Sequence, residues 1–257
     1  MESVILDFGI GGWVFLLTVG LLAGLVKGVV GFAMPMVLIS GLGSMVSPEV
    51  ALAGLIVPTL VTNLWQSLRQ GVRAAWVSIT RFKLFLMIGF VVLMGAAQLV
   101  PHLPKSLMSL MIGVPVALYA AIELTGRAVR LPGGAGRRGE ATMGAIAGFF
   151  AGISGVWGPP TVAMLTARNT EKTEQMRVQG VIYGLGSVAL IWAHMVSGVL
   201  NSGTLPLSVA LVVPGLLGLW IGFRIQDRID QRTFRKLTLL VLLIAGLNLV
   251  RRGVLAI

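Results

Sequence analysis

The feature that most constrains this chain is its series of long, uncharged apolar segments. A helix needs roughly 20 residues to cross a hydrocarbon core of about 30 Å, and six segments meet or approach that length. Soluble domains carry roughly 25% charged residues, whereas this chain of 257 residues carries 11%, with 56% in the hydrophobic set. This composition excludes a soluble enzyme or regulator. The six segments lie near 49–68, 84–100, 106–124, 178–199, 205–223 and 235–250.

Two further apolar runs are interrupted by glycine and proline. Residues 12–45 are too many for one upright helix and break at Lys27–Pro35, and residues 142–167 break at Gly152–Pro160. Proline favours the first position of a helix. We therefore expect each run to continue as a short second helix, over 35–43 and 159–167.

The two broken runs are related by a shift of 124 positions, which places Gly20 on Gly144 and Pro35 on Pro159. Four more glycine or alanine positions between them also coincide. We interpret this match as an internal duplication. The predicted organisation is an N-terminal repeat at 1–125, an exposed linker at 126–139 rich in arginine, glycine and proline, and a C-terminal repeat at 140–257, together forming one membrane domain.

The positions of lysine and arginine favour an inverted arrangement of the repeats. If every apolar segment crossed once, the basic residues would divide evenly between the two sides, against the positive-inside rule. The rule is satisfied if each broken run enters and leaves on one side, as a re-entrant hairpin or a pair of short helices. The inside intervals are then 69–83, 127–138, 168–177 and 224–236, which hold all lysines and arginines except Lys27, Lys105, Arg251 and Arg252.

The predicted fold is therefore an all-α polytopic membrane protein with two inverted-topology repeats. Each repeat has a broken, re-entrant helix pair plus three transmembrane helices, and both chain termini lie outside. Inverted repeats recur in secondary transporters. The linker at 126–139 is expected on the cytoplasmic side.

A substrate site is expected where the two helix breaks meet. Non-helical backbone at membrane depth is tolerated only where protein or a water-filled cavity satisfies its polar groups, and helix N-termini attract anions. Two such ends from inverted halves predict a site for a small anion near the midplane. The predicted binding residues are Lys27, Gly28, Gly31, Phe32, Pro35 and Asn63 in the first half and Gly152, Ser154, Gly155, Trp157, Pro159 and Gln179 in the second.

The same residues have structural interpretations. The glycines upstream of each break have the four-residue spacing of a helix-packing face, but the following proline and the recurrence favour ligand binding for Gly28–Pro35 and Gly152–Pro160. Lys27, whose repeat equivalent is Ala151, either faces a cavity or snorkels to the interface. Either cavity lining or structural hydrogen bonding explains the other polar residues within apolar segments, which are Asn63, Gln66, Gln179, Tyr183 and His194.

The broken runs resemble the TauE/SafE sulfite exporter family. The resemblance rests on Gly24-Leu-Val-Lys-Gly28-Val-Val-Gly31-Phe-Ala-Met-Pro35 and Gly148-Phe-Phe-Ala-Gly152-Ile-Ser-Gly155-Val-Trp-Gly158-Pro159-Pro160, with support from Glu174-Gln-Met-Arg177-Val-Gln179-Gly180. It covers essentially the whole chain and implies a bacterial inner-membrane transporter of sulfite, organosulfonates or related anions. The motifs are mostly glycine and identify the class better than the substrate. Lys27 departs from the family pattern, in which a small residue is common there.

We therefore expect a transporter that exports small sulfur-containing oxyanions by alternating access, without catalytic residues, cofactor or metal site. The expected partners are a small anionic substrate and the lipid bilayer. The net charge of +11 reflects basic loops rather than nucleic-acid binding, and a homodimer is left open. With no cysteine and two histidines, an enzyme is disfavoured. A structural scaffold is disfavoured because the breaks cost backbone hydrogen bonds. A passive anion channel and a carrier of another organic anion remain alternatives.

Overall fold

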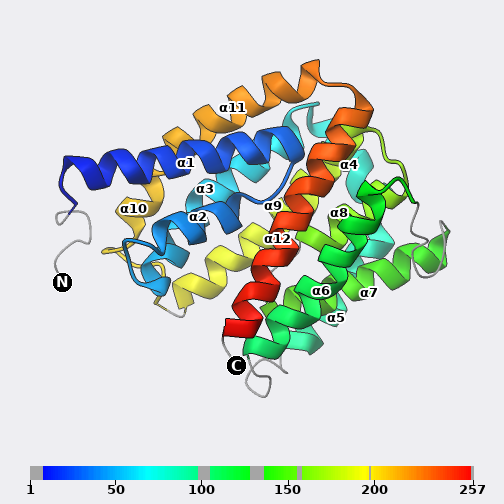
Figure 1. Ribbon diagram of the computed structural model, residues 1–257, viewed down its shortest axis with the longest axis horizontal. Helices are drawn as coiled ribbons and strands as arrows, with labels where there is room; N and C mark the ends of the chain where they lie inside the picture. Colours follow the sequence, from blue (N-terminus) through cyan, green and yellow to red (C-terminus); the bar gives the residue numbers. More distant parts are fainter. Residues whose placement is uncertain (1–7, 98–104, 128–135, 155–157, 197, 256–257) are drawn as a thin grey trace. The chain divides into compact units, whose positions relative to one another are not determined.

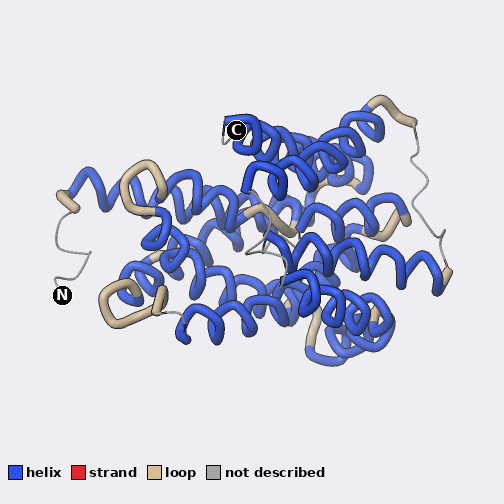
Figure 2. Tube along the Cα trace, turned by 90° about the horizontal axis from the view of Figure 1, so that it is seen from below, coloured by secondary structure: helices blue, strands red, loops and turns tan. Residues whose placement is uncertain are grey.

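The computed structural model describes residues 8–97, 105–127, 136–154, 158–196 and 198–255. Over these residues Figure 2 shows helices joined by loops, without a strand. Figure 1 labels the helices in chain order. They are α1 (Ile10–Val30), α2 (Met34–Leu42), α3 (Pro48–Leu68), α4 (Val72–Arg81), α5 (Lys83–Ala97), α6 (Lys105–Leu124), α7 (Arg137–Ser154), α8 (Gly158–Ala167), α9 (Lys172–Val196), α10 (Leu205–Ala210), α11 (Val212–Arg228) and α12 (Gln231–Leu255).

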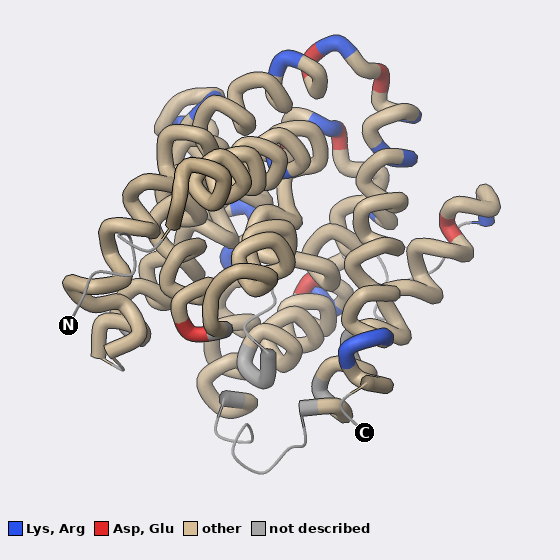
Figure 3. The backbone as a smooth tube through the Cα atoms, turned by 60° about the vertical axis from the view of Figure 1, so that its left-hand side comes forward, with Lys and Arg blue, Asp and Glu red and all other residues tan. Residues whose placement is uncertain are grey.

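Five helical segments within the described residues are long and apolar enough to cross a membrane. A sixth arises if α4 and α5, which are bent by 68° against each other, form one span. Figure 3 shows long uncharged stretches of helix, with charged residues mainly near helix ends. An all-helical, multi-pass membrane protein is thus confirmed. The five segments are Ile10–Val30, Glu49–Leu68, Lys172–Val196, Leu205–Arg228 and Gln231–Leu255.

The first predicted helix break is present at residues 31–33, and residues 155–157 of the second lie outside the described residues. The first run divides into α1 and α2, and the second into α7 and α8. Pro35 and Pro159 each lie in the first turn of the second helix, so the predicted helices at 35–43 and 159–167 are confirmed to within one residue. α1 is longer than expected for one half of a broken pair, because its 21 residues suffice to cross a membrane alone.

One predicted connection is helical instead. The sequence predicts a loop at 69–83, whereas α4 occupies most of it. Val72, Trp76 and Val77 on α4 are exposed, while Ala75 and Ser78 are buried. α4 is a short amphipathic helix, and a search for long uncharged segments does not detect this pattern. The connections predicted at 168–177 and 224–236 are also shorter, because α9 and α12 begin and α11 ends within them.

The chain forms two compact units, and each takes segments from both halves of the sequence. Unit 1 contains residues 1–71 and 180–229, and unit 2 contains 72–179 and 230–257. These units describe packing, whereas the repeats at 1–125 and 140–257 describe a duplication of sequence. The two divisions therefore differ, and the division into repeats stays a prediction.

In unit 1, α1 lies along α11 (Figure 1), and glycines allow the close approach. A Cβ atom on Gly24 would lie 2.1 Å from the carbonyl oxygen of Gly215, and one on Gly28 would lie 2.4 Å from that of Leu219. Residue numbers rise together along both helices, so the two helices run parallel. The predicted packing role of Gly24 is confirmed. The adjoining apolar core contains Leu16, Val19, Ala23, Met34, Leu38, Leu42, Ala51, Leu55, Ile56, Leu207 and Leu211.

Within the same unit, α2 turns back along α1, and α3 then runs in the direction of α1. The end of α2 packs against Val19 in the middle of α1 and against Gly54 near the start of α3. Further along, Lys27 of α1 contacts Asn63 of α3. α1 and α3 therefore begin at the same end of unit 1, which is the course predicted for a hairpin that enters and leaves on one side.

Unit 2 contains a second parallel helix pair, α5 and α7. A Cβ atom on Gly144 would lie 2.7 Å from the carbonyl oxygen of Phe85, and one on Gly148 would lie 2.1 Å from that of Gly89. Under the sequence duplication, α7 corresponds to α1 and α5 to α11. The pair α1–α11 in unit 1 therefore has an equivalent in the pair α5–α7 in unit 2, and both pairs are parallel.

The other long contact in unit 2 joins α6 and α12, which run antiparallel. A Cβ atom on Gly113 would lie 2.8 Å from the carbonyl oxygen of Gly246, whereas one on Gly253 would lie 2.9 Å from that of Ser106. The beginning of α6 and the end of α12 therefore share one end of the pair. α8 packs on both helices, and the hydroxyl of Tyr119 on α6 donates a hydrogen bond of 3.0 Å to a carbonyl of α8.

Candidate functional site

The first helix break is a short, left-handed backbone segment. Gly31 closes α1 with φ 87° and ψ −2°, and its N–H donates to the carbonyl oxygen of Lys27 at 2.6 Å. Ala33 precedes α2 with φ 74° and gives this helix no side-chain cap. A left-handed conformation costs a non-glycine residue roughly 1–2 kcal/mol, and such strain is typical of functional sites.

Lys27 reaches inward from the last turn of α1 and is 1% exposed. Its Nζ donates to Oδ1 of Asn63 on α3. The Asn63 amide in turn donates through Nδ2 to Oγ of Ser187 at 2.8 Å, and the Ser187 hydroxyl donates to the carbonyl oxygen of Tyr183 at 2.7 Å. Because Ser187 gives its hydrogen to Tyr183, it accepts from Asn63, and the Asn63 carbonyl is thereby directed at the lysine.

A second side chain of α3 connects this network to the break. Gln66 lies one turn after Asn63, is 1% exposed, and donates through Nε2 to the carbonyl oxygen of Gly31 at 3.0 Å. This hydrogen bond connects α3 to the helix break. Gln66 and Asn63 thus place two amides beside the end of α1.

No carboxylate pairs with Lys27 in the part of the chain that the structure describes. The ion pair of unit 1 is formed by Arg69 and Asp227 at 2.5 Å, with the guanidinium of Arg69 also 4.2 Å from the ring centre of Phe223. Arg69 follows Asn63 by six residues, which corresponds to about 9 Å along α3. Lys27 therefore lies away from the charged end of unit 1. It has no ionic partner among the described residues.

The remaining first-half candidates lie around the same break. Phe32 is 3% exposed within the break, and Pro35 is half-buried at the start of α2. Gly28 faces α11, where a side chain would also meet Gly222. Close packing is therefore sufficient to explain glycine at position 28, and its role toward a ligand stays a prediction. Of the first-half set, the structure brings Lys27 and Asn63 into direct contact.

The second-half candidates belong to unit 2 and are described less completely. Gly152 and Ser154 lie in the last turn of α7, and Pro159 is buried in α8. Gln179 is buried on α9. Gly155 and Trp157 lie outside the described residues. The expectation that both breaks contribute to one site stays a prediction.

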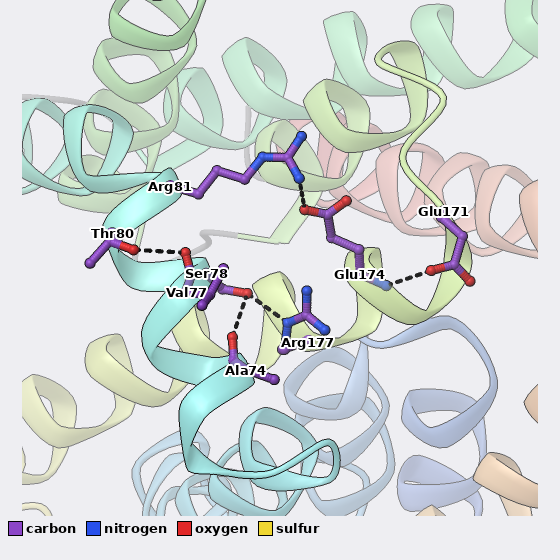
Figure 4. A network of polar contacts seen from close by, with 8 residues as sticks. All are labelled: Ala74, Val77, Ser78, Thr80, Arg81, Glu171, Glu174 and Arg177. Carbon is purple, nitrogen blue, oxygen red and sulfur yellow. Dashed lines mark hydrogen bonds and ion pairs between the residues drawn. The ribbon is translucent and has the colours of Figure 1, made fainter.

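Unit 2 carries a polar network where α4 meets the start of α9 (Figure 4). Arg177 donates through Nε to Oγ of Ser78 at 2.7 Å, and Arg81 is ion-paired with Glu174. Glu171 accepts the backbone N–H groups of Thr173 and Glu174, which caps α9. Burial acts to raise the pKa of Glu171, but these hydrogen bonds outweigh burial and hold the pKa below its usual value.

A second polar cluster of unit 2 joins α6, α12 and the turn between α8 and α9. Glu123 is buried near the end of α6 and is ion-paired with Arg235 of α12, whose guanidinium also contacts Asn169. Gln231 accepts the N–H of Lys172 at 2.8 Å and donates to the carbonyl oxygen of Thr170 at 3.0 Å. The turn before α9 is thus fixed from two sides.

The chain matches the family described as "Sulfite exporter TauE/SafE" over residues 16–249. It belongs to this family. No curated protein and no solved structure gave a match. The match spans both helix breaks and confirms the resemblance carried by the two glycine motifs. A TauE/SafE protein is a membrane transporter, in agreement with the spans described above.

In this TauE/SafE chain, the sequence interpretation missed Ser187 and the partners of Arg177. Ser187 has a signal in the sequence, because it occupies the position of Asn63 under the duplication. An alignment of the two repeats would have directed attention to it. Arg177 was noted as part of a family motif, but its partner Ser78 lies in the segment that was expected to be a loop.

Proposed function

We propose that this protein exports sulfite, organosulfonates or related small sulfur-containing oxyanions by alternating access, and that the anion binds at the first helix break. The observation that carries the proposal is Lys27, an ammonium buried in a membrane-spanning helix with an amide as its partner. A buried charge of this kind calls for a counter-ion. Membership of a sulfite exporter family supports an oxyanion in that role.

The magnitudes support this assignment. Burial of an ammonium costs several kcal/mol even after relaxation. A hydrogen bond to a charged group returns about 1.5–3 kcal/mol, and a cation in the last turn of a helix gains about 0.3–1 kcal/mol. These two contributions together barely offset the cost. An anion about 4 Å away would attract the ammonium by about 4 kcal/mol at an effective dielectric constant of 20. This attraction stabilises the charged lysine and is set against the desolvation of the anion itself.

The chemistry at the break suits a compact oxyanion. An ammonium has three N–H donors, of which Asn63 takes one. The other two can serve two oxygens of a sulfonate or sulfite group. α2 begins at Met34, three residues after Gly31, and the positive end of this helix dipole favours the same ligand. A ligand role for the second-half candidates Gly152, Ser154, Gly155, Trp157, Pro159 and Gln179 stays a prediction.

The proposed transport cycle rests on inverted repeats, and two helix pairs support that architecture. α6 and α12 are equivalent under the duplication and run antiparallel in unit 2. α3 and α9 are also equivalent, and within unit 1 Gly180 meets Ser67 while Gly184 meets Asn63, so they too run antiparallel. Equivalent helices that point in opposite directions are what inverted topology predicts. We place the protein in the bacterial inner membrane with both termini outside.

Titration of the purified protein tests the proposal. Isothermal calorimetry with sulfite, methanesulfonate and the neutral dimethyl sulfone should show binding of the two anions and none of the neutral compound. Preference for the sulfone would contradict an anion site. In liposomes, flux should saturate with anion concentration, and flux that rises without limit would assign a channel instead of a carrier.

A further inference from the structure

Among the described residues of unit 1, no charged group compensates Lys27. In unit 1, α1 packs against α2 and α11, and Lys27 contacts α3, whose Asn63 is bound in turn by α9. The described part of α2 has no charged residue, and α1 has none besides Lys27. The titratable or charged residues on the other elements of the unit are Glu49 and Arg69 at the ends of α3, Tyr183 and His194 on α9, and Arg224, Asp227 and Arg228 on α11.

None of these groups neutralises the lysine. Glu49 is fourteen residues from Asn63, about 21 Å along α3. Asp227 is ion-paired with Arg69, and the arginines share the sign of Lys27. His194 lies seven residues beyond Ser187, about 10 Å along α9, and a tyrosine phenol is uncharged near neutral pH. The charged form of Lys27 is thus favoured mainly while an anion is bound.

We infer that Lys27 binds one proton together with each anion and releases it when the anion leaves, so that this protein moves an oxyanion and a proton in the same direction. The inference rests on the proposed anion transport. On the loading side, a proton from water joins the Nζ lone pair and the anion binds the resulting ammonium. On the other side the anion and the proton both leave, and the free amine returns.

The hydrogen-bond network accommodates both states of the lysine. A neutral amine keeps two N–H donors and an ammonium has three, so either form can donate to Oδ1 of Asn63. Ser187 holds the Asn63 amide with this oxygen toward Lys27 in each case. The empty site therefore keeps its hydrogen bond without keeping a buried charge.

The charge that crosses the membrane follows from this step. A singly charged sulfonate moves with one proton, so its transport is electroneutral. A doubly charged anion moves with one net negative charge, which the inside-negative potential drives outward. The two classes of substrate should therefore differ in their response to membrane potential.

The experiment uses full-length protein in liposomes that contain the pH dye pyranine, with a gradient of methanesulfonate. This anion is the salt of a strong acid and has no neutral form that could carry protons across the lipid. Methanesulfonate entry should acidify the lumen by one proton per anion, and its rate should be unchanged when valinomycin and potassium set the potential. Entry of 1,2-ethanedisulfonate should respond to the potential.

Two variants distinguish the binding of the proton from the binding of the anion. Arginine is not deprotonated in proteins, so Lys27→Arg should lower net uptake by about tenfold or more relative to its own anion exchange between loaded liposomes, because the empty site cannot return uncharged. Lys83→Arg changes an exposed lysine of α5 in the same way and should leave both rates unaltered. Anion flux by the unmodified protein without acidification overturns the inference and leaves the proposed function standing. Absence of any anion flux overturns both.

Discussion

Asn63 donates a hydrogen bond of 2.8 Å to Ser187, and the two residues are 124 positions apart. This separation equals the shift that relates the two glycine motifs. If a two-fold axis relates the two repeats, a residue can contact its own repeat equivalent only near that axis. The contact between Asn63 and Ser187 therefore indicates where such an axis would lie. The duplication has diverged at this point into an amide and a hydroxyl, and only the amide contacts Lys27. At this position the two halves of the duplication therefore contribute differently to the network around Lys27.

Replacement of Asn63 by Asp should abolish most of the anion affinity. The new carboxylate would lie beside the ammonium of Lys27 and compete directly with the substrate, since an opposite charge within about 4–6 Å stabilises the charged lysine. We expect the affinity for methanesulfonate to fall by about tenfold or more, as measured by calorimetry. Ser187→Ala is the matched control, because it removes one neutral hydrogen bond of the same network and should lower the affinity only about fivefold. Equal losses of methanesulfonate affinity in both variants would contradict competition between the new carboxylate and the anion.

The sequence predicted the helix breaks well because glycine and proline act locally. Gly31 and Pro35 determine where α1 ends and α2 begins, whatever packs around them. The partners of Lys27 could not be predicted in the same way. Asn63 was only one of several polar residues in apolar segments, and its contact depends on α2 turning back so that α3 runs beside α1.

Addition of a methyl group at Gly148 should destabilise unit 2. A Cβ atom there would lie 2.1 Å from the carbonyl oxygen of Gly89, so α5 and α7 would have to separate. Overpacking of this kind typically costs about 1–3 kcal/mol, and the midpoint of thermal unfolding in detergent should fall for Gly148→Ala. Gly95 on α5 has nothing within 4 Å of its Cβ position, and Gly95→Ala should leave the midpoint unchanged or raise it. The reverse order would contradict the parallel contact of α5 and α7.

Gly31→Val should abolish transport by altering the break itself. The residue has φ 87°, a conformation that is poorly accessible to a β-branched side chain, and a strain of roughly 1–2 kcal/mol is expected. Asparagine tolerates this region, so Gly31→Asn should fold and insert like the unmodified protein. A liposome flux assay should then show whether a side chain at position 31 blocks the anion. Normal transport by both variants would place the site elsewhere. The corresponding change at Gly155, Gly155→Val, should also abolish transport.

The difference between repeats and packing units shows another limit of the sequence. The motif shift identifies which helices are equivalent, but packing follows the apolar faces that helices present to one another. α1 therefore pairs with α11 from the other half, and α5 pairs with α7. The close approach within these pairs depends on glycines such as Gly24 and Gly148, whose spacing is visible in the sequence although their partners are not.

Both termini should lie outside the cytoplasmic membrane, with the linker at 126–139 inside. This prediction rests on the intervals rich in lysine and arginine, which the positive-inside rule places in the cytoplasm. In the structure, the start of α6 and the end of α12 share one end of their helix pair. The other end carries the ion pair of Glu123 and Arg235. Fusion of a topology reporter after residue 257 should report an outside location, and fusion within 133–136 should report the cytoplasm. A cytoplasmic C-terminus would contradict the inverted repeats.

Removal of the Lys27 charge provides the most direct measure of how the anion is held. If the ammonium and the start of α2 share the ligand, Lys27→Met should weaken methanesulfonate binding by about 1–3 kcal/mol, the usual cost of leaving a buried polar group without its partner. Methionine is also apolar and flexible enough to fill the space left by the lysine stem, so the helix should remain packed.

Calorimetric titration of purified Lys27→Met should give a dissociation constant raised by about 5–150-fold. Lys83→Met, at an exposed position on α5, serves as the matched control and should bind like the unmodified protein. An unchanged affinity in Lys27→Met would show that the lysine takes no part in the site. Complete loss of binding in a variant that still folds would show that the lysine alone holds the anion, without a contribution from the helix that begins at the break.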